Sequence, residues 1–288
     1  MVHVLCNVLS GGGRASRILG TVVESLKERG LSPRVRVAVT MAGCREEAQA
    51  VRDENPATVV VVGGDGTLRE VGRVFAGTGI PLLIVPAGTG NGLAYSLRLP
   101  LSPERCLDLL DTGQVRNMDV AQTGAGLFLN VAGVGLDAEV AGRAKRLQYV
   151  KGLPAYVVTV LEKLHDFSPF KYRIRTDEDC VMQGKAILVA VGNGSCYGKN
   201  IGIVPGAEAF DGWLDLCVVE QLKPLELSTV IGMLMAGRLH HHPRVRRRRV
   251  RKAEIATDPP HLVHLDGDVM ASTPVTVEVL PGALSVFV

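Results

Sequence analysis

The sequence predicts an α/β domain with a doubly wound parallel sheet, followed by a domain that is mainly an antiparallel β-sandwich. Residues 1–120 alternate strand-like and helix-like segments, which is the order of a parallel sheet with right-handed crossovers. Residues 121–288 read mostly as short strands with turns between them. Because no linker or repeat separates the halves, we place the boundary at this change of rhythm, with the last strand as a candidate to return to the first domain.

Each strand-like segment of the first domain precedes a helix. The helix after the first strand has an apolar face from Ile18 to Leu26, and another helix is expected at Arg45–Arg52. A last helix begins after the N-cap Ser102, which a proline follows, and ends at Gly113. The strands are expected at Val2–Leu9, Arg34–Thr40, Val59–Val62 and Ile80–Val85.

The second domain is expected to contain strands and one helix, at Leu147–Leu164. The first two strands are joined by the Gly124-Ala125-Gly126 turn and should form a hairpin. The expected strands are Met118–Thr123, Leu127–Ala132, Tyr172–Thr176, Lys185–Val191, Trp213–Glu220, Ala253–Thr257, His261–Leu265, Pro274–Leu280 and Leu284–Val288.

The composition is that of a soluble protein from a reducing compartment. With 288 residues and 47% hydrophobic content, the chain can build two cores, and its net charge of +3 is too small to indicate a nucleic-acid partner. The six cysteines form no CxxC pair, so we expect reduced, buried thiols. No signal-peptide pattern and no apolar run long enough for a membrane helix are present, which predicts a cytoplasmic protein.

Two glycine-rich turns are the strongest functional signal. Gly63–Thr67 follows a run of four valines, and Pro86–Gly92 follows the next strand along the chain. Each turn lies between a buried strand and a helix, where backbone N–H groups can hold phosphate. Because successive parallel strands end at the same sheet edge, we expect the turns to lie side by side. A single turn of this kind is often purely structural, but the pair predicts a phosphate site.

Three familiar phosphate-binding signatures are absent. The chain has no GxxxxGK[ST] motif, which argues against a Walker-type NTPase. The second turn, Gly88–Gly92, lacks the GxGxxG spacing of a dinucleotide-binding domain. The HRD and DFG motifs of protein kinases are also missing.

At these residues the chain resembles the diacylglycerol-kinase-like lipid kinases, a superfamily that includes sphingosine kinases, ceramide kinases and small bacterial lipid kinases. The resemblance covers nearly the whole chain and implies an NAD kinase-like nucleotide domain followed by a lipid-binding β domain. The matching motifs, in the order of the family, are Gly63–Thr67 at GGDGT, Pro86–Gly92 at P-x-G-[ST]-x-N, Asp119, Asn130–Asp137, Asn193-Gly194, Pro205–Asp215 at PxAxxxDGxLD and Leu265–Asp268 at LDGE.

The cofactors implied are ATP and Mg²⁺. Phosphoryl transfer requires positioned phosphates, a divalent cation and an acceptor for the proton of the attacking hydroxyl. Glycines let the backbone approach the phosphates, and the carboxylate of Asp65 would repel ATP unless Mg²⁺ lay between them. With the contacts that the resemblance adds, the expected nucleotide-binding residues are Asn7, Ser10, Gly11, Thr40, Gly63, Gly64, Asp65, Gly66, Thr67, Glu70, Gly88, Thr89 and Asn91.

The resemblance also implies the catalytic and structural carboxylates. Either Asp266 or Asp268 is expected to accept the proton of the lipid hydroxyl, with Asp65 as the third catalytic residue. Asp266-Gly267 equally fits a plain hairpin turn. By the same resemblance a second, structural Mg²⁺ is held by the Asp211 side chain and two backbone oxygens, with Asp119 supporting it through water. The backbone oxygens belong to Glu208 and Trp213. Asp211 before a glycine also fits an ordinary turn.

Four features depart from the pattern of the family, one of which is Gly198-Lys199-Asn200 in place of a glycine run. The opening NPxSG motif lacks its proline, and Arg69 stands where the family usually has Asn. Asp268 replaces the glutamate of LDGE, which shortens the acid by one methylene and leaves open whether Asp266 or Asp268 is the base.

Two charged runs have structural as well as functional explanations. Adjacent side chains point in different directions, so His240–His242 is expected to be a solvated loop and not a metal site. Arg246–Arg249 fits either a solvated strand or loop, or a contact with anionic lipid headgroups, worth about 1 kcal/mol per basic residue. The second explanation would place the protein at the inner face of a membrane.

The function predicted from these observations is that of an ATP-dependent lipid kinase. Its substrate is a lipid with a primary hydroxyl, such as a diacylglycerol or a sphingoid base. Two alternatives remain at this point. An NAD kinase shares GGDGT and the two-domain plan, although its usual Asn-Glu pair after the second turn is missing. A non-catalytic nucleotide- or lipid-binding regulator would account for Arg69 and Asp268.

Overall fold

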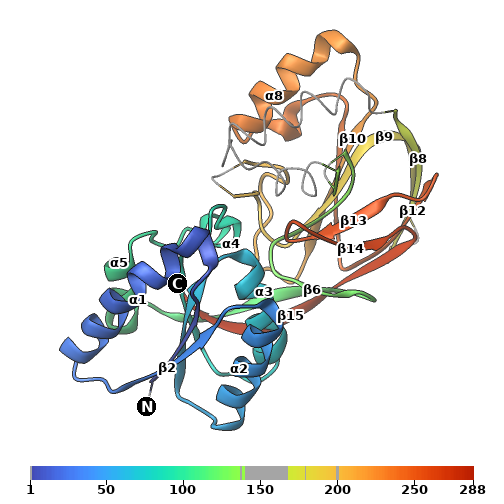
Figure 1. Ribbon diagram of the computed structural model, residues 1–288. Helices are drawn as coiled ribbons and strands as arrows, with labels where there is room; N and C mark the ends of the chain where they lie inside the picture. The colour runs from blue at the N-terminus through green and yellow to red at the C-terminus, as the bar shows by residue number, and fades with distance from the viewer. Residues whose placement is uncertain (1, 137, 140–167, 179, 199–200) are drawn as a thin grey trace.

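Two domains of different architecture make up the chain in the computed structural model (Figure 1). The structure describes residues 2–136, 138, 139, 168–178, 180–198 and 201–288. The helix expected at Leu147–Leu164 lies outside the described residues. The predicted fold class is confirmed: a parallel α/β domain precedes an antiparallel β domain.

Parallel strands form the sheet of the first domain in the spatial order β4-β3-β1-β2. Their registers are regular, with Val4 of β1 opposite Val35 of β2 on one side and Val60 of β3 on the other. All four predicted strands are present, each with ends that differ slightly from expectation. Their bounds are β1 Val2–Asn7, β2 Pro33–Ala38, β3 Thr58–Gly63 and β4 Leu82–Pro86.

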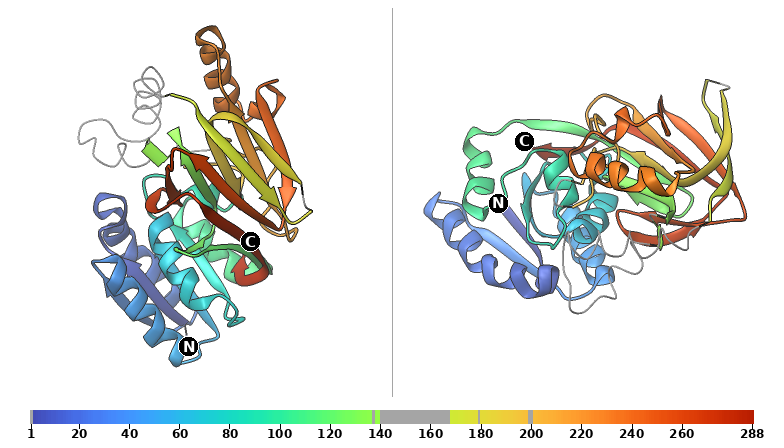
Figure 2. Two further views of the ribbon diagram at one scale, coloured as in Figure 1. Left: turned by 90° about the vertical axis from the view of Figure 1, so that its right-hand side faces the viewer. Right: turned by 90° about the horizontal axis from the view of Figure 1, so that it is seen from above.

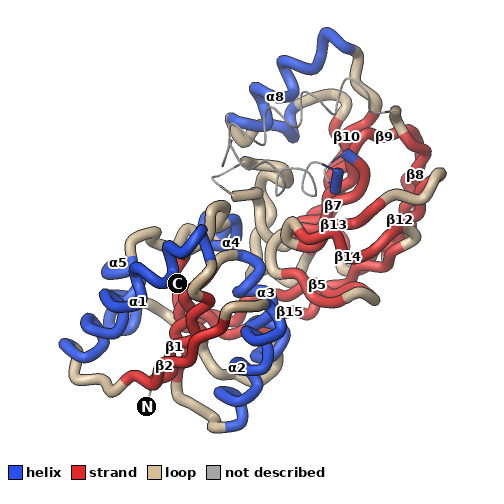
Figure 3. Tube along the Cα trace, viewed as in Figure 1, coloured by secondary structure: helices blue, strands red, loops and turns tan. Residues whose placement is uncertain are grey.

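Helices cover both faces of this sheet (Figure 3). Alternate residues of β3 decide which helices pack where, because side chains of a strand alternate between faces. Val60 and Val62 share a core with α1 and α5, while Val59 and Val61 share one with α2, α3 and α4. Ser102 caps α5 as predicted. The helices are α1 Ser10–Glu28, α2 Met41–Asp53, α3 Asp65–Phe75, α4 Gly92–Ser96 and α5 Pro103–Thr112.

Antiparallel strands form the second domain, and they continue the hydrogen-bonded sheet of the first. The predicted pairs β5/β6 and β8/β9 are present. The strands are β5 Val115–Thr123, β6 Gly126–Phe128, β7 Val131–Gly135, β8 Phe170–Thr176, β9 Val181–Gly192, β10 Leu214–Glu220, β11 Val245–Val250, β12 Lys252–Asp258, β13 Leu262–Leu265, β14 Asp268–Ser272 and β15 Val275–Phe287.

β15 connects the two domains. Its first half pairs with β12 of the second domain, and Val286 near its end pairs in parallel with Leu82 of β4. The strands expected at Pro274–Leu280 and Leu284–Val288 are therefore one strand, whose register shifts between Leu280 and Leu284. The C-terminus consequently lies in the first domain, as both views in Figure 2 show.

The arginine run, for which a strand was one interpretation, forms the strand β11, whose backbone pairs with β10. The strand β14, the helix α8 and two 3₁₀ turns were not expected from the sequence. β14 pairs with β13 across the Asp266-Gly267 turn. The helix α8 (Leu227–Met235) covers one face of β9 and β10 through Val230 and Leu234, between the 3₁₀ turns η1 (Pro224–Glu226) and η2 (Leu239–His241).

The cysteines largely match the expectation of buried thiols. All six lie in the described part of the chain and are free. Five are buried and Cys180 is only half-buried. Burial raises the pKa of the Cys6 and Cys44 thiols to about 11, so both are neutral at ordinary pH.

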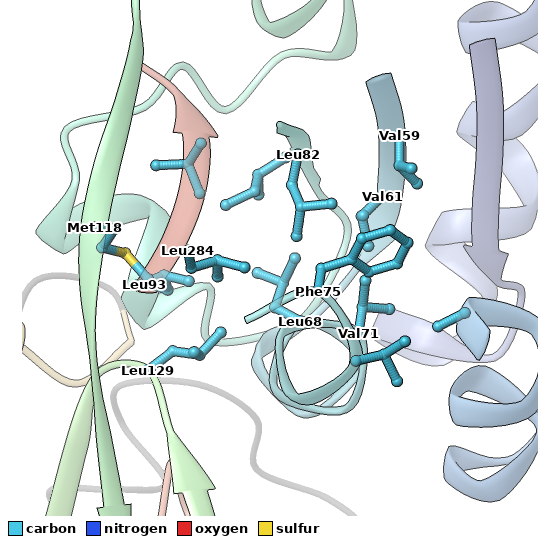
Figure 4. Close-up of a cluster of buried hydrophobic side chains, with 14 of the residues drawn as sticks. Val59, Val61, Leu68, Val71, Phe75, Leu82, Leu93, Met118, Leu129 and Leu284 are labelled. Carbon is cyan, nitrogen blue, oxygen red and sulfur yellow. The ribbon is translucent and has the colours of Figure 1, made fainter. Parts of the chain in front are cut away.

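Phe75 should be one of the most important side chains for stability. It is the last residue of α3, and its side chain is fully buried against strands β3 and β4 (Figure 4). Phe75→Ala should lower the free energy of unfolding by about 4 kcal/mol, because it removes apolar contacts and leaves a cavity. Urea denaturation followed by circular dichroism measures this. The control Val37→Ala, at a side chain that is 48% exposed, should cost less than about 1 kcal/mol. Equal losses would contradict the placement of this core.

Candidate active site

The two glycine-rich turns lie side by side at the carboxyl ends of β3 and β4. A Cβ placed on Gly88 would stand only 2.7 Å from the Cα of Gly64, so neither turn can carry a side chain there. A Cβ on Gly63 would likewise stand 2.6 Å from the Thr67 side chain. These glycines are required by close backbone approach within the protein.

The turn after β1 is tied to the first glycine-rich turn. Asn7 donates from Nδ2 to the Thr67 hydroxyl at 3.1 Å, and the Ser10 hydroxyl lies 3.2 Å from the same oxygen. Gly11 has a φ of 63°, and a Cβ there would strike the carbonyl oxygen of Ala87 at 2.1 Å. The predicted residues Asn7, Ser10, Gly11 and Thr67 are therefore brought together.

Asp65 faces the second turn. Its Oδ1 accepts the backbone N–H of Leu93 at 3.0 Å, at the start of α4. Burial raises the pKa of Asp65, while the N–H groups of residues 91–93 act in the opposite direction. The start of α4 is thus occupied by a carboxylate of the protein, contrary to the expectation that this helix end would be open to phosphate. The negative charge of Asp65 consequently does not by itself require Mg²⁺.

Asn91 offers an acceptor at the second turn. It adopts the left-handed conformation with φ 55° and is 7% exposed. Its Oδ1 has no hydrogen-bond partner among the described residues, which is costly for a buried oxygen. A donor group of a bound ligand would satisfy it. Thr89 is exposed beside it, so both predicted residues border the same surface.

Two other predicted nucleotide contacts have structural partners. The Thr40 hydroxyl caps α2 by accepting the Gly43 N–H at 2.9 Å. The Glu70 carboxylate is buried, and it pairs with Arg45 and lies 3.5 Å from Nε of Arg69. An ATP contact through Glu70 stays a prediction, since arginines already surround this carboxylate.

Asp266 supports the backbone of the hairpin between β13 and β14. Its two carboxylate oxygens accept N–H groups of Leu129, Asn130 and Val131 at 2.8, 2.9 and 3.1 Å. Burial raises the pKa of Asp266 to about 6, against the lowering effect of these N–H groups and of Arg69. This carboxylate holds the hairpin against the segment before β7, which favours the turn interpretation of Asp266.

Asp268 lies at the first glycine-rich turn, on the same hairpin. Its Oδ2 would stand 3.8 Å from a Cβ placed on Gly66. It also pairs at 2.8 Å with Arg69, whose NH1 donates to the carbonyl oxygen of Leu265 at 2.7 Å. Of the two candidate bases, Asp268 is the one whose carboxylate reaches the GGDGT turn.

Buried polar side chains fix the segments around the hairpin. His264 is fully buried, accepts the Gly267 N–H at Nδ1 and contacts the Tyr197 hydroxyl through Nε2 at 2.9 Å. Asn130 contacts the Ser96 hydroxyl and the carbonyl oxygen of Cys196. These contacts connect the loop 193–198 with α4 and with the hairpin.

The proposed structural metal residues form a turn closed by an arginine. Asp211 accepts the Trp213 N–H at 3.0 Å through Oδ1 and pairs with Arg249 through Oδ2. Asp119 accepts the N–H groups of Gly212 and Gly282 at 2.7 Å each. A cation at Asp211 and the backbone of Glu208 and Trp213 would have to displace the guanidinium of Arg249. The side chains at this turn therefore do not fit a metal ion.

No cluster of three or more His, Cys, Asp or Glu side chains that could hold a metal ion occurs in the part of the chain that the structure describes. His240–His242 is not the solvated loop that was expected, because His242 is buried and accepts the Arg244 N–H.

A metal ion in a kinase need not be held by a cluster of protein side chains. Mg²⁺ is usually held there mainly by substrate phosphates, with one or two carboxylates.

Each arginine of β11 has an acidic partner. Arg247 pairs with Asp215 at 3.0 Å, on the face where Arg249 pairs with Asp211. On the opposite face Arg246 lies 2.6 Å from Glu220 and Arg248 lies 2.5 Å from Glu178. The local charge of this run is therefore largely neutralised.

Arg69 and His264 are the site residues that the sequence did not reveal. Arg69 was noticeable only as a departure from a motif, and the partner of its guanidinium is 199 positions further along the chain. His264 adjoins the LDGD sequence, which was the only available signal.

Comparison with known families assigns this architecture to a class. The family described as "Diacylglycerol kinase catalytic domain" matches residues 1–123, and "YegS C-terminal NAD kinase beta sandwich-like domain" matches residues 130–288. The chain therefore belongs to the diacylglycerol kinase-like lipid kinase superfamily and is a lipid kinase.

Relatives and solved structures agree with this assignment. A diacylglycerol kinase of Mycobacterium tuberculosis is 30% identical, over 99% of this chain and 94% of its own. A "Probable lipid kinase YegS-like" of Pseudomonas aeruginosa is 31% identical, over 97% and 92%. In fold, the chain resembles a Bacillus anthracis diacylglycerol kinase structure (TM-score 0.75, 22% identity, 99% and 95% covered). It also resembles yeast NADH kinase (TM-score 0.52, 12% identity, 99% and 82% covered).

Within the described residues, no helix has the length and apolar character needed to cross a membrane.

Asp266→Asn should remove a pH dependence of stability. Because the pKa of Asp266 is raised from 3.8 to about 6, its protonated form stabilises the fold fully below about pH 4. That contribution is lost as the pH rises through about 6. The free energy of unfolding of the wild type, relative to the variant, should therefore fall over this range. Urea denaturation at several pH values measures the difference, and a constant difference would contradict the raised pKa.

Proposed function

We propose that the protein transfers the γ-phosphoryl group of Mg-ATP to the primary hydroxyl of a diacylglycerol-like or sphingoid lipid. The main support for this proposal is the position of Asp268. This carboxylate of the second domain lies against Gly66 in the first glycine-rich turn. A hydroxyl held at this junction would be close both to the phosphates and to a proton acceptor. Residues 1–120 would bind the nucleotide, and residues 121–288 would bind the lipid.

The glycine-rich turns support nucleotide binding. Their paired glycines leave the backbone without side-chain cover, and the orphan oxygen of Asn91 offers an acceptor for a hydroxyl or amino group of the nucleotide. Thr89 and Gly66 border the same region. The kinase family implies ATP as the phosphoryl donor.

Asp65 is the side chain that fits a cation shared with ATP. It is one carboxylate beside both glycine-rich turns, and Mg²⁺ in kinases is commonly held by one or two carboxylates together with phosphates and water. When bound, the cation would neutralise charge on the phosphates. Of the two metal sites expected from the sequence, the side-chain contacts support this one better than Asp211.

Asp268 would act on the substrate hydroxyl. As the hydroxyl oxygen forms its bond to the γ-phosphorus, the bond from that phosphorus to the bridging oxygen breaks, and ADP leaves with the electron pair. The hydroxyl proton passes to the Asp268 carboxylate. Asp266 is less suited to this role, because its oxygens already accept three backbone N–H groups.

The names of the relatives support a diacylglycerol-like lipid as the substrate in this proposal. The Mycobacterium tuberculosis relative is named a diacylglycerol kinase, and the Pseudomonas relatives are named lipid kinases without a substrate. A sphingoid base offers the same primary hydroxyl above an apolar tail. The likeness to yeast NADH kinase is limited to the fold and does not favour NAD as the acceptor.

Asp268→Asn should lower turnover by about 10²–10⁴ with ATP affinity preserved, because it removes the proton acceptor. Transfer from radiolabelled ATP to short-chain diacylglycerol, sphingosine, ceramide, a glycerophospholipid and NAD, with and without Mg²⁺, gives the measurement. Full activity of Asp268→Asn would exclude this carboxylate as the base, and exclusive transfer to NAD would exclude a lipid substrate.

Asp65→Ala should abolish Mg-ATP binding or turnover without unfolding.

Contact with an anionic membrane face is also part of the proposal. Arg246 and Arg248 point from one face of β11 and remain partly exposed despite their acidic partners. Changing both to Ser should weaken binding to phosphatidylserine vesicles severalfold, with the difference shrinking as salt rises, because exposed charges act over about 8 Å at physiological ionic strength.

Vesicle co-sedimentation measures this, and Arg34 and Arg36 provide a matched control. They are also paired with acids on an edge strand, so changing both to Ser removes the same charge elsewhere. Equal binding by the β11 variant and wild type at low salt would assign the run to a structural role only.

A further inference from the structure

Arg69 connects the first glycine-rich turn with both sides of the turn between β13 and β14. It lies in α3, two positions after Thr67 of the first glycine-rich turn. One nitrogen donates to the carbonyl oxygen of Leu265, the last residue of β13, and another pairs with Asp268, the first residue of β14. A single guanidinium group therefore binds the hairpin on either side of its turn.

The arginine itself is held rigidly. Its side chain is 5% exposed, and its Nε lies 3.5 Å from Glu70, whose carboxylate is also bound by Arg45. The Asp268 side chain is 35% exposed, so packing restricts it far less. An ordered, buried partner can fix the orientation of a partly exposed carboxylate, because the loss of side-chain freedom has already occurred on folding.

We propose that Arg69 is a positioning residue for Asp268, and that the two residues act as one unit that presents a short acid to the phosphate turn. This inference rests on the proposed function, in which Asp268 accepts the proton of the lipid hydroxyl. Arg69 and Asp268 are two of the positions where the chain departs from the motifs of its family, and the structure brings them into direct contact.

In this chain the contact joins the two departures. An aspartate is one methylene shorter than a glutamate, so its carboxylate needs the hairpin close to Gly66 and needs a fixed orientation. The hydrogen bond from Arg69 to the Leu265 carbonyl keeps the hairpin backbone close to Gly66. The ion pair with Asp268 fixes the orientation of the carboxylate. A displacement of about 1 Å at a reacting group can cost about 100-fold in rate.

Arg69→Asn should lower kcat about 10- to 100-fold and leave the KM for ATP within about threefold, because positioning of the base is lost and nucleotide contacts are kept. Arg73→Asn is the matched control. This variant removes an arginine of the same helix that lies 3.8 Å from Glu70, whereas the contacts with Leu265 and Asp268 described above are made by Arg69. Its kcat should stay within about twofold of the wild type.

Exchange of both residues tests whether they form a unit. Asp268→Glu alone should lower kcat, because the longer acid no longer fits between Arg69 and Gly66. The double variant Arg69→Asn/Asp268→Glu should recover at least about tenfold over Arg69→Asn. Arg69→Lys, which keeps the charge but cannot bind Leu265 and Asp268 together, should lie between Arg69→Asn and the wild type.

Full-length variants would be assayed for kcat and KM with ATP and the panel lipid that accepts phosphate best, after thermal melting confirms folding. If Arg69→Asn is poorly folded, Arg69→Lys and the double variant carry the test. A wild-type kcat in Arg69→Asn would overturn the positioning role of Arg69 but not the proposed function. The same holds if the kcat loss of the double variant equals the product of the two single losses. An active Asp268→Asn would instead overturn the proposed base, so the two failures are distinguishable.

Discussion

Close approach of backbone segments at the ends of β3 and β4 is the constraint on which the site depends. Gly64 and Gly88 bring the two turns into direct contact, and a Cβ on Gly198 would stand 2.4 Å from the Cα of Gly90. No side chain fits at either of these two contacts. The start of α3, the start of α4 and a loop of the second domain therefore meet without intervening side chains, which leaves backbone groups to form the surface for a nucleotide.

Carboxylates at the domain junction mainly satisfy the backbone. Asp65 accepts an N–H of α4, Asp119 accepts those of Gly212 and Gly282, and Asp266 accepts three from residues 129–131. Buried N–H groups in irregular segments need such acceptors, since no strand or helix pairs them. Asp268 pairs with the guanidinium of Arg69 and lies at the first glycine-rich turn.

The path of β15 determines how the domains are joined. It begins beside β12, bends where Gly282 donates to Asp119, and ends against β4. The sheet consequently runs without interruption from one domain to the other, and the hairpin that carries Asp268 is anchored to the same framework as the glycine-rich turns. Figure 1 shows this strand passing between the two halves. Such a connection resists independent movement of Asp268 and the glycine-rich turns more than a flexible linker would.

The sequence by itself determined the order of elements, the two glycine-rich turns and the family, because these depend on local periodicity and short motifs. It did not decide between a strand and a loop for the arginine run that forms β11, and it did not reveal the continuity of β15. It also left Asp266 and Asp268 equivalent. Only the tertiary structure separated them, by placing N–H groups from residues 129–131 around one and Arg69 beside the other. Such partners lie more than 130 positions away along the chain, and no local pattern encodes which distant backbone a carboxylate will meet.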